Sequence, residues 1–371
     1  MRIGVPTEIK THEYRVGLVP QSVRELVARG HTVIVERNAG AGIGALDDEY
    51  RAAGASIVDG AAEIFLRADL IVKVKEPQAV ERRQLRPGQV LFAFLHLAPD
   101  PDQARELIAS GAVAVAYETV TSETGGLPLL APMSAVAGRM SVQVAAHFLE
   151  KPQGGMGVLM SGAPGVAPAS VVVLGAGVAG SNAAAVAAGM GAQVTVLDRA
   201  LEQMKRLELQ LGSRVRAMLS SPAAIEAAIG EADAVVGAAL VPGALAPKLV
   251  TRPMLARMRP GAVLVDVSID QGGCFETSRV TTHAEPTFVV DGILHYCVAN
   301  MPGAVPRTSA FALNNATLPF ATALADHGWK DALRRDPHLR NGLNICKGRV
   351  TNRQVAGALG LEWSAPEAAI A

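Results

Sequence analysis

The chain has 371 residues, half of them hydrophobic (50%), and its 34 Lys and Arg residues balance 34 Asp and Glu residues. This length is sufficient for two domains with separate cores, and a net charge of zero gives no electrostatic support for binding nucleic acid or an anionic membrane. The three cysteines, at positions 274, 297 and 346, are far apart, so we expect neither a disulfide framework nor a metal site. No secretory signal or membrane-spanning run is visible, which favours a cytoplasmic protein.

Short apolar runs alternate with helical patterns from the beginning of the chain. The predicted strands of this first series are 2–6, 31–36, 70–75, 91–97 and 113–118. Between them lie segments such as 20–30, in which apolar residues recur at helical spacing up to Gly30. Alternation of this kind predicts a largely parallel sheet with helices on both faces.

A second series of apolar runs begins near residue 170. Its predicted strands are 170–177, 193–198, 215–219, 234–240, 262–268 and 293–298. Two long helices are predicted on either side of it, one over 133–151 with its cap near Ser134, and one over 309–328 with a kink at Pro319. We therefore predict an α/β fold of two doubly wound, Rossmann-like domains joined by long helices, with a cleft between the domains. The predicted boundaries are 1–128 plus 306–371 for one domain and 129–305 for the other.

The second series opens with a dinucleotide-binding fingerprint. Gly175, Gly177 and Gly180 form G-x-G-x-x-G between an apolar strand and an Ala-rich helix. The glycines permit a tight turn, close approach of a pyrophosphate and close helix packing, and the helix N-terminus favours phosphate. Asp198 ends the next strand, where a carboxylate accepts hydrogen bonds from a ribose 2′-hydroxyl and repels a 2′-phosphate. We expect NAD as the cofactor, although the neighbouring Arg199 is a feature compatible with NADP.

Polar side chains stand at the carboxyl ends of several predicted strands, where doubly wound domains bind ligands. They are Lys75, His96, Asp270 and Asn300, and the apolar Met301 follows the last of them. Arg15 lies in the first connection between a strand and a helix. Arg15 and Lys75 can hold a carboxylate, and His96 can exchange a proton near neutral pH. Lys73 shares the strand face of Lys75, so the pattern alone does not exclude it.

The chain closely resembles alanine dehydrogenases and, more distantly, the NAD-binding part of proton-translocating transhydrogenases. The resemblance spans nearly the whole sequence and is carried by 4–20, 73–77, 94–98, 131–141, 171–180, 264–273 and 298–309. It implies the reversible oxidation of L-alanine by NAD to pyruvate and ammonium in a homohexamer. Two alternatives stay open. One is an NAD(H)-binding transhydrogenase subunit, although that family lacks a histidine at the position of His96. The other is a related dehydrogenase for a larger amino acid.

The resemblance also implies roles for individual residues. Arg15 and Lys75 match the positions that bind the substrate, His96 the general acid/base, and Asp270 the acid that helps to activate ammonia or water. The positions that match the NAD site, besides the three glycines, are Ser134, Val178, Asp198, Ser220, Ala239, Leu240, Val267, Ser268, Ile269, Asp270, Val298, Asn300 and Met301. Departures from the family pattern are Phe94, where members can have tyrosine, Gln203, where members can have a cation near the cofactor, and His12 in place of asparagine.

Overall fold

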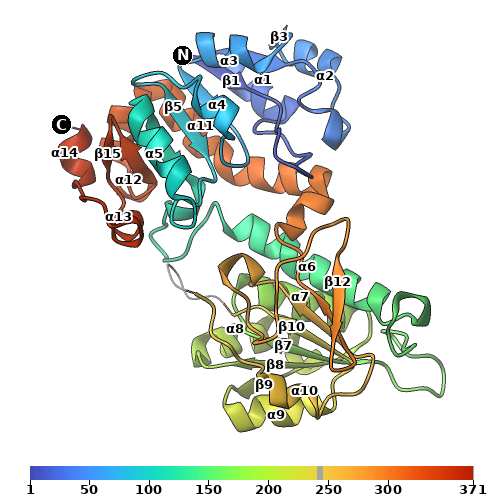
Figure 1. The fold of residues 1–371 in the computed structure, drawn as a ribbon. Helices are drawn as coiled ribbons and strands as arrows, with labels where there is room; N and C mark the ends of the chain where they lie inside the picture. Colours follow the sequence, from blue (N-terminus) through green and yellow to red (C-terminus); the bar gives the residue numbers. More distant parts are fainter. Residues whose placement is uncertain (240–244, 371) are drawn as a thin grey trace. The chain divides into compact units, whose positions relative to one another are not determined.

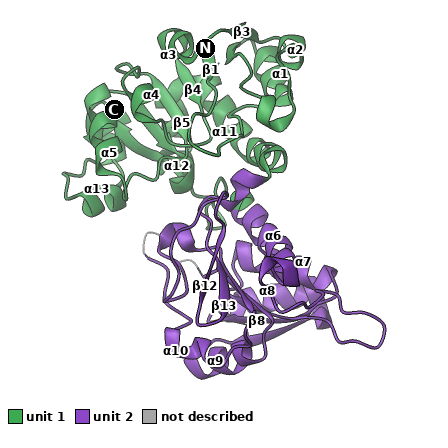
Figure 2. Cartoon of the chain, turned by 45° about the vertical axis from the view of Figure 1, so that its right-hand side comes forward, with its two compact units in different colours: residues 1–133, 305–371 green, residues 134–304 purple. Residues whose placement is uncertain are grey.

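The computed structural model describes residues 1–239 and 245–370. The chain folds into two compact units (Figures 1 and 2). Unit 1 comprises Met1–Met133 and Val305–Ala371, and unit 2 comprises Ser134–Ala304. The chain therefore begins in unit 1, forms all of unit 2 and then returns. Each unit is built on a mostly parallel sheet with interleaved helices, which confirms the predicted α/β class.

Within the described residues, unit 1 contains an eight-stranded sheet in the order β15-β14-β6-β5-β4-β1-β2-β3. Its strands are β1 (Arg2–Val5), β2 (Thr32–Glu36), β3 (Ser56–Val58), β4 (Leu70–Val72), β5 (Val90–Ala93), β6 (Val113–Ala116), β14 (Leu343–Cys346) and β15 (Arg349–Val350). β1 to β6 run parallel, whereas β14 pairs antiparallel with β6, and β15 pairs antiparallel with β14. The sequence pattern missed β3, β14 and β15, which are short or lie at one edge.

The strand order of unit 1 reverses its direction between β1 and β4. β2 and β3 follow on one side of β1, and β4, β5 and β6 on the other. Connections that leave neighbouring strands in opposite directions open a space at the carboxyl edge of the sheet, which is the usual ligand site of such folds. The loops that follow β1 and β4 therefore lie at the expected place for a substrate.

The helices of unit 1 cover this sheet (Figure 1). They are α1 (Pro20–Ala28), α2 (Asp47–Ala52), α3 (Ala61–Arg67), α4 (Ala79–Arg82), α5 (Pro101–Ser110), α11 (Pro306–Arg335), α12 (Pro337–Arg340), α13 (Arg353–Leu359) and α14 (Pro366–Ile370), with 3-10 turns η1 (Ala41–Ile43) and η2 (Tyr117–Thr119). Pro319 lies inside α11, and the predicted kink there stays a prediction, whereas α11 leaves helical geometry at Gly328, with φ 72° and ψ 154°. Glycine adopts this conformation without the steric cost that a Cβ brings.

Unit 2 has, within its described residues, a seven-stranded sheet in the order β12-β13-β11-β10-β7-β8-β9. Its strands are β7 (Ser170–Leu174), β8 (Gln193–Asp198), β9 (Val215–Leu219), β10 (Ala234–Gly237), β11 (Val263–Asp266), β12 (Thr287–Val290) and β13 (Ile293–Tyr296). Only β12 pairs antiparallel among these strands. The winding reverses between β7 and β10, so the glycine-rich loop after β7 lies at the switch point of this sheet.

The helices of unit 2 are α6 (Ala131–Phe148), whose first three residues belong to unit 1, α7 (Val178–Gly189), α8 (Leu201–Leu211), α9 (Pro222–Gly230) and α10 (Arg252–Leu255), with η3 (Lys151–Gln153), η4 (Gly212–Arg214), η5 (Ile269–Gln271) and η6 (Met301–Ala304). α6 begins at Ala131, so the predicted cap near Ser134 is wrong. Pro132 lies in the first turn, where a missing amide N–H costs nothing. Among the described residues, every helix is too short or too polar to cross a bilayer.

Candidate functional site

His96 follows β5 in a backbone conformation that few residues adopt. Its φ is 48°, in the left-handed region. Its amide N–H donates to Oε1 of Glu118 at 2.7 Å, and the amide of Leu95 donates to the same carboxylate at 3.2 Å. Glu118 lies in η2, directly after the neighbouring strand β6. These bonds hold the strained backbone and leave the imidazole 41% exposed, so His96 is not a core side chain.

The imidazole of His96 contacts two further side chains. The ring of Phe94 stacks on it at a centroid distance of 5.7 Å and an angle of 23°. Phe94 is itself buried and packs edge-on against Tyr117. On another side, Nδ1 of His96 lies 3.8 Å from Oε2 of Glu76. The predicted departure at Phe94 thus places an apolar ring, rather than a phenol, against the histidine.

Glu76 is a residue of this site that sequence reasoning missed. Its carboxylate is mostly buried and pairs with Lys10 from the loop after β1. Burial alone would raise the pKa of Glu76, but the nearby His96 imidazole and the ammonium groups of Lys75 and Lys10 outweigh it and hold the pKa well below its usual range. The signal in the sequence was an acid directly after Lys75, at the end of a predicted strand.

The structure distinguishes the two lysines that the strand pattern left open. Lys73 is fully buried, with Nζ 2.8 Å from Oε1 of Glu81 and 3.2 Å from Oε2 of Glu8. Glu8 also accepts the amide N–H of Val74 at 2.6 Å. Lys75 is partly exposed and acts electrostatically on Glu76. Lys73 therefore belongs to a buried ion-pair network, and Lys75 remains the substrate-binding candidate.

Arg15 is buried and held by an acidic neighbour. Its Nε donates to Oε1 of Glu13 at 2.6 Å, Nη2 pairs with the other oxygen, and Nη1 lies 3.1 Å from Sδ of Met133. Glu13 in turn donates its amide N–H to the carbonyl of Lys10, the partner of Glu76. The loop after β1 therefore carries both Arg15 and a contact to the His96 environment. Sequence reasoning missed Glu13, although it lies two residues from Arg15.

The glycine-rich loop of unit 2 fits a dinucleotide phosphate. Gly175 has φ 108°, and a Cβ there would lie 2.8 Å from the carbonyl oxygen of Ala238. A Cβ on Gly180 would overlap the carbonyl oxygen of Gly175. Gly177 precedes α7, which starts at Val178, and apart from its chain neighbours no described atom lies within 4 Å of its Cβ position. No side chain caps α7, so its first amides remain directed towards the loop, as a phosphate site requires.

Asp198 ends β8 and is half-buried beside the glycine-rich loop. Its Oδ2 accepts the amide N–H of Ala176 at 2.5 Å, and Oδ1 accepts that of Ala200 at 2.7 Å. The same aspartate accepts, through its main-chain carbonyl, the amide of Ser220 at 2.8 Å. Each carboxylate oxygen has a second lone pair, so this bonding is compatible with a ribose hydroxyl. Arg199 is exposed.

Most of the remaining predicted residues of unit 2 that the structure describes follow strands of its sheet. Ser268 Oγ donates to the carbonyl of Ala239 at 2.7 Å, and the amide of Asn300 lies 3.4 Å from Oδ2 of Asp270. Ile269 and Asp270 are in η5 and Met301 begins η6. The amide of Val267 bonds to β10, Val298 is buried, and Ser134 lies in α6. Leu240 lies outside the described residues.

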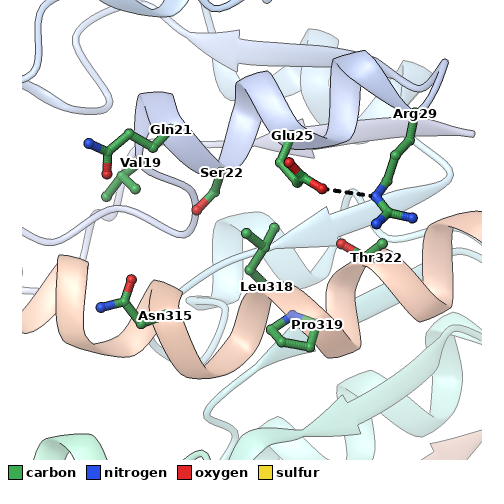
Figure 3. A pocket seen from close by; sticks show the side chains of 9 residues that line it. All are labelled: Val19, Gln21, Ser22, Glu25, Arg29, Asn315, Leu318, Pro319 and Thr322. Carbon is green, nitrogen blue, oxygen red and sulfur yellow. Dashed lines mark hydrogen bonds and ion pairs between the residues drawn. The ribbon is translucent and has the colours of Figure 1, made fainter.

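A groove of about 500 Å³ occurs elsewhere in unit 1, between α1 and α11 (Figure 3). Ser22 and Glu25 line it from α1, Arg29 from the residue that follows α1, and Pro319 and Thr322 from α11. Glu25 and Arg29 pair with each other at 3.2 Å. None of the predicted site residues lines this groove, so it is separate from the residues around His96.

Comparisons with known proteins cover nearly the whole chain. Family models described as alanine dehydrogenase/PNT match with their N-terminal domain over residues 4–137 and their C-terminal domain over 141–353. The chain is 58% identical to an alanine dehydrogenase of Halomonas elongata over 98% of both chains. It is 52% identical to an alanine dehydrogenase of Mycobacterium tuberculosis over 100% of both.

Solved structures agree with these relatives. An L-alanine dehydrogenase matches with a TM-score of 0.94 at 49% identity, over 97% of this chain and 99% of the other. A transhydrogenase from Sinorhizobium meliloti matches with a TM-score of 0.81 at 27% identity, over 95% of this chain and 99% of the other.

Proposed function

The chain belongs to the alanine dehydrogenase/PNT family, and from this premise we propose that it catalyses the reversible, NAD-dependent oxidative deamination of L-alanine to pyruvate and ammonium. The observation that carries the proposal is His96, an exposed imidazole at the carboxyl edge of the unit 1 sheet. His96 lies beside the Glu76 carboxylate, and Lys75 acts electrostatically on the same carboxylate. We assign the substrate role to 1–128 with 306–371, and the nucleotide role to 129–305.

The side chains of this chain divide the work as follows. Lys75 and Arg15 bind the substrate carboxylate, and because Glu13 neutralises part of the Arg15 charge, Lys75 carries the larger share. His96 takes and returns the protons of the amine and of water. Asp270, near the amide of Asn300, helps to activate water or ammonia. Bound NAD⁺ supplies the hydride acceptor for the substrate Cα.

We further propose that the cofactor is NAD rather than NADP, because the Asp198 carboxylate would repel a 2′-phosphate. The nucleotide would be held by Ser134, Gly175, Gly177, Val178, Gly180, Asp198, Ser220, Ala239, Leu240, Val267, Ser268, Ile269, Asp270, Val298, Asn300 and Met301. By family resemblance we also expect a homohexamer in the cytoplasm. Light scattering after size-exclusion chromatography would test the assembly, since a hexamer has six times the chain mass of 38.4 kDa.

One assay tests the proposed reaction directly. NADH formation is followed at 340 nm with a panel of L-amino acids, and NADP⁺ replaces NAD⁺ in a parallel series. We expect the highest kcat/KM with L-alanine and NAD⁺. A larger amino acid as the best substrate would support the related dehydrogenase instead.

The transhydrogenase alternative makes a different prediction for the same assay. Its support is the structural match at 27% identity. A nucleotide-binding subunit would bind NAD(H) and yet form no NADH from any amino acid. That result, with NADH binding verified by fluorescence, would overturn the proposed function.

A further inference from the structure

The two oxygens of Glu76 have different surroundings. Oε1 pairs with Lys10. Oε2 is buried and accepts no hydrogen bond within the part of the chain that the structure describes, while Nδ1 of His96 lies 3.8 Å away. A buried carboxylate oxygen without a donor is costly, so it normally has a partner in the working state of a protein.

The imidazole of His96 is constrained in a way that presents Nδ1 to this oxygen. Glu118 holds the backbone amide, and Phe94 stacks on the ring. The two nitrogens lie on different edges of an imidazole, so a ring with Nδ1 towards Glu76 has Nε2 directed away from it. Nε2 is then the nitrogen available to a substrate.

We propose that Glu76 is the positioning residue of His96: in the substrate complex its Oε2 accepts the Nδ1–H bond and thereby selects the tautomer whose Nε2 exchanges protons with substrate. A carboxylate behind a histidine acts in this way in other enzymes, and removing it leaves the ring in the wrong tautomer. The distance of 3.8 Å between Nδ1 of His96 and Oε2 of Glu76 is longer than a hydrogen bond, and such distances in active sites commonly shorten when substrate binds. This inference rests on the proposed function for the identity of the substrate.

The charges around Glu76 are consistent with this role. Lys10 and Lys75 favour its ionised form, and an ionised carboxylate can only accept hydrogen bonds. A competing role is that Glu76 merely holds Lys75 in place for the substrate carboxylate. The two roles differ in which kinetic constant depends on Glu76 and in what happens once His96 is absent.

The first test observes the tautomer without catalysis. The full-length protein is labelled with ¹⁵N-histidine, and ring nitrogen shifts are recorded at alkaline pH with NAD⁺ and pyruvate, a pair that has no hydride to transfer. His96→Gln identifies the His96 signals. We expect Nδ1–H in the unmodified protein and mainly Nε2–H in Glu76→Ala, with Glu63→Ala, an exposed carboxylate of α3, as the control. The same tautomer in both proteins would overturn the proposal.

The second test uses kinetics. Glu76→Ala should lower kcat roughly 10- to 100-fold, as do losses of carboxylates that orient metal-bound histidines, while KM for pyruvate and Kd for NADH change less than about twofold. In a His96→Ala background the same substitution should have no further effect. A raised KM for pyruvate, or a decrease in kcat that persists in the His96→Ala background, would show that Glu76 holds Lys75 and would refute its role on His96. Glu76→Met, which keeps a similar side-chain length and has no carbonyl or carboxylate acceptor, replaces Glu76→Ala if the latter does not fold.

The two tests distinguish a failure of the proposed function from a failure of the positioning role of Glu76. If Glu76 selects the tautomer but no amino acid is oxidised, the proposed function fails and the positioning role stands. If alanine is oxidised and the tautomer is independent of Glu76, only this inference fails.

Discussion

Three carboxylates, those of Glu13, Glu76 and Glu118, hold the predicted catalytic groups of unit 1. Glu13 orients the Arg15 guanidinium, and Glu118 fixes the left-handed backbone of His96. Glu76 faces the imidazole. The predicted site residues therefore contact acidic side chains, one from the same loop and two from other strand ends. We expect substitutions at these neighbours to affect activity although the neighbours do not contact the substrate.

His96→Ala should reduce kcat by about 10²- to 10⁴-fold, the usual contribution of a general acid/base. The side chain is 41% exposed and lies at the surface, so its removal leaves no cavity in a core and the fold should persist. Steady-state kinetics in both directions and NADH binding by fluorescence measure the two quantities. Turnover near that of the unmodified enzyme would show that His96 has no catalytic role.

Glu76 should also affect stability in acid. Its pKa is lowered in the folded state from an ordinary value of 4.5, so it stabilises the fold above that pH, and the contribution is lost as pH falls below 4.5. The difference in free energy of unfolding between the unmodified protein and Glu76→Gln should therefore be constant near neutrality and shrink in acid. Urea titrations at several pH values measure it. A difference that grew in acid would contradict the assigned charge state.

At the scale of the element, the end of β4 combines a buried, ion-paired lysine with the lysine proposed to bind substrate. Lys73 lies inside with Glu8 and Glu81, whereas Lys75 is two residues further along and partly exposed. Burial opposes the charge of Lys73, but the two carboxylates outweigh it and raise its pKa. The same segment thus fixes the loop and presents a cation at the sheet edge.

Lys73→Met and Lys75→Met form a matched pair. Lys73→Met leaves buried carboxylates without their cation and should lower the free energy of unfolding by about 3–5 kcal/mol. Lys75→Met should change the free energy of unfolding by less than about 0.5 kcal/mol. It should lower kcat/KM for pyruvate by a factor that corresponds to a loss of roughly 2–4 kcal/mol of transition-state stabilisation. Urea denaturation and steady-state kinetics on both variants test this. The reverse assignment of effects would exchange the roles of the lysines.

The loop between β7 and α7 depends on Asp198 as well as on its glycines. Asp198→Ala removes the acceptor of the Ala176 amide and the negative charge that opposes a 2′-phosphate. We expect weaker NAD⁺ binding and a smaller preference for NAD⁺ over NADP⁺, measured as the ratio of kcat/KM values. If the unmodified enzyme already used both cofactors equally, Arg199 would be the more important residue.

At the scale of the whole molecule, each unit carries its own doubly wound sheet and its own set of loops at the carboxyl edge. The nucleotide candidates belong to unit 2, whereas Arg15, Lys75 and His96 belong to unit 1. The nucleotide alone should therefore protect segments of unit 2 from hydrogen exchange.

Hydrogen exchange measured by mass spectrometry should show this division. Saturating NAD⁺ is expected to slow exchange over 175–180, 198–200 and 267–270, because ligands suppress local opening of the segments they bind. The helix α13 (Arg353–Leu359) of unit 1 serves as the internal reference. Protection confined to unit 1, with none in unit 2, would be incompatible with the proposed nucleotide site.

The sequence alone was sufficient for the α/β class, the two series of strands and the glycine-rich loop. These features depend on local patterns: apolar runs of strand length, and glycines at a spacing that a tight turn and a helix start require. Errors occurred where local patterns are ambiguous. The break of α11 at Gly328 was not predicted as a kink within a longer helix, α6 begins at Ala131 rather than near Ser134, and the short strand β3 has too few residues for a recognisable period.

Only the tertiary structure decided which charged groups are partners. By strand period Lys73 and Lys75 are equivalent, yet one is buried between Glu8 and Glu81 and the other is at the edge. Glu76 and Glu118 approach His96 from separate loops, and such contacts depend on strand order, which the sequence pattern does not specify. Side-chain electrostatics act over a few ångströms in space, whatever the separation along the chain, and so require the fold.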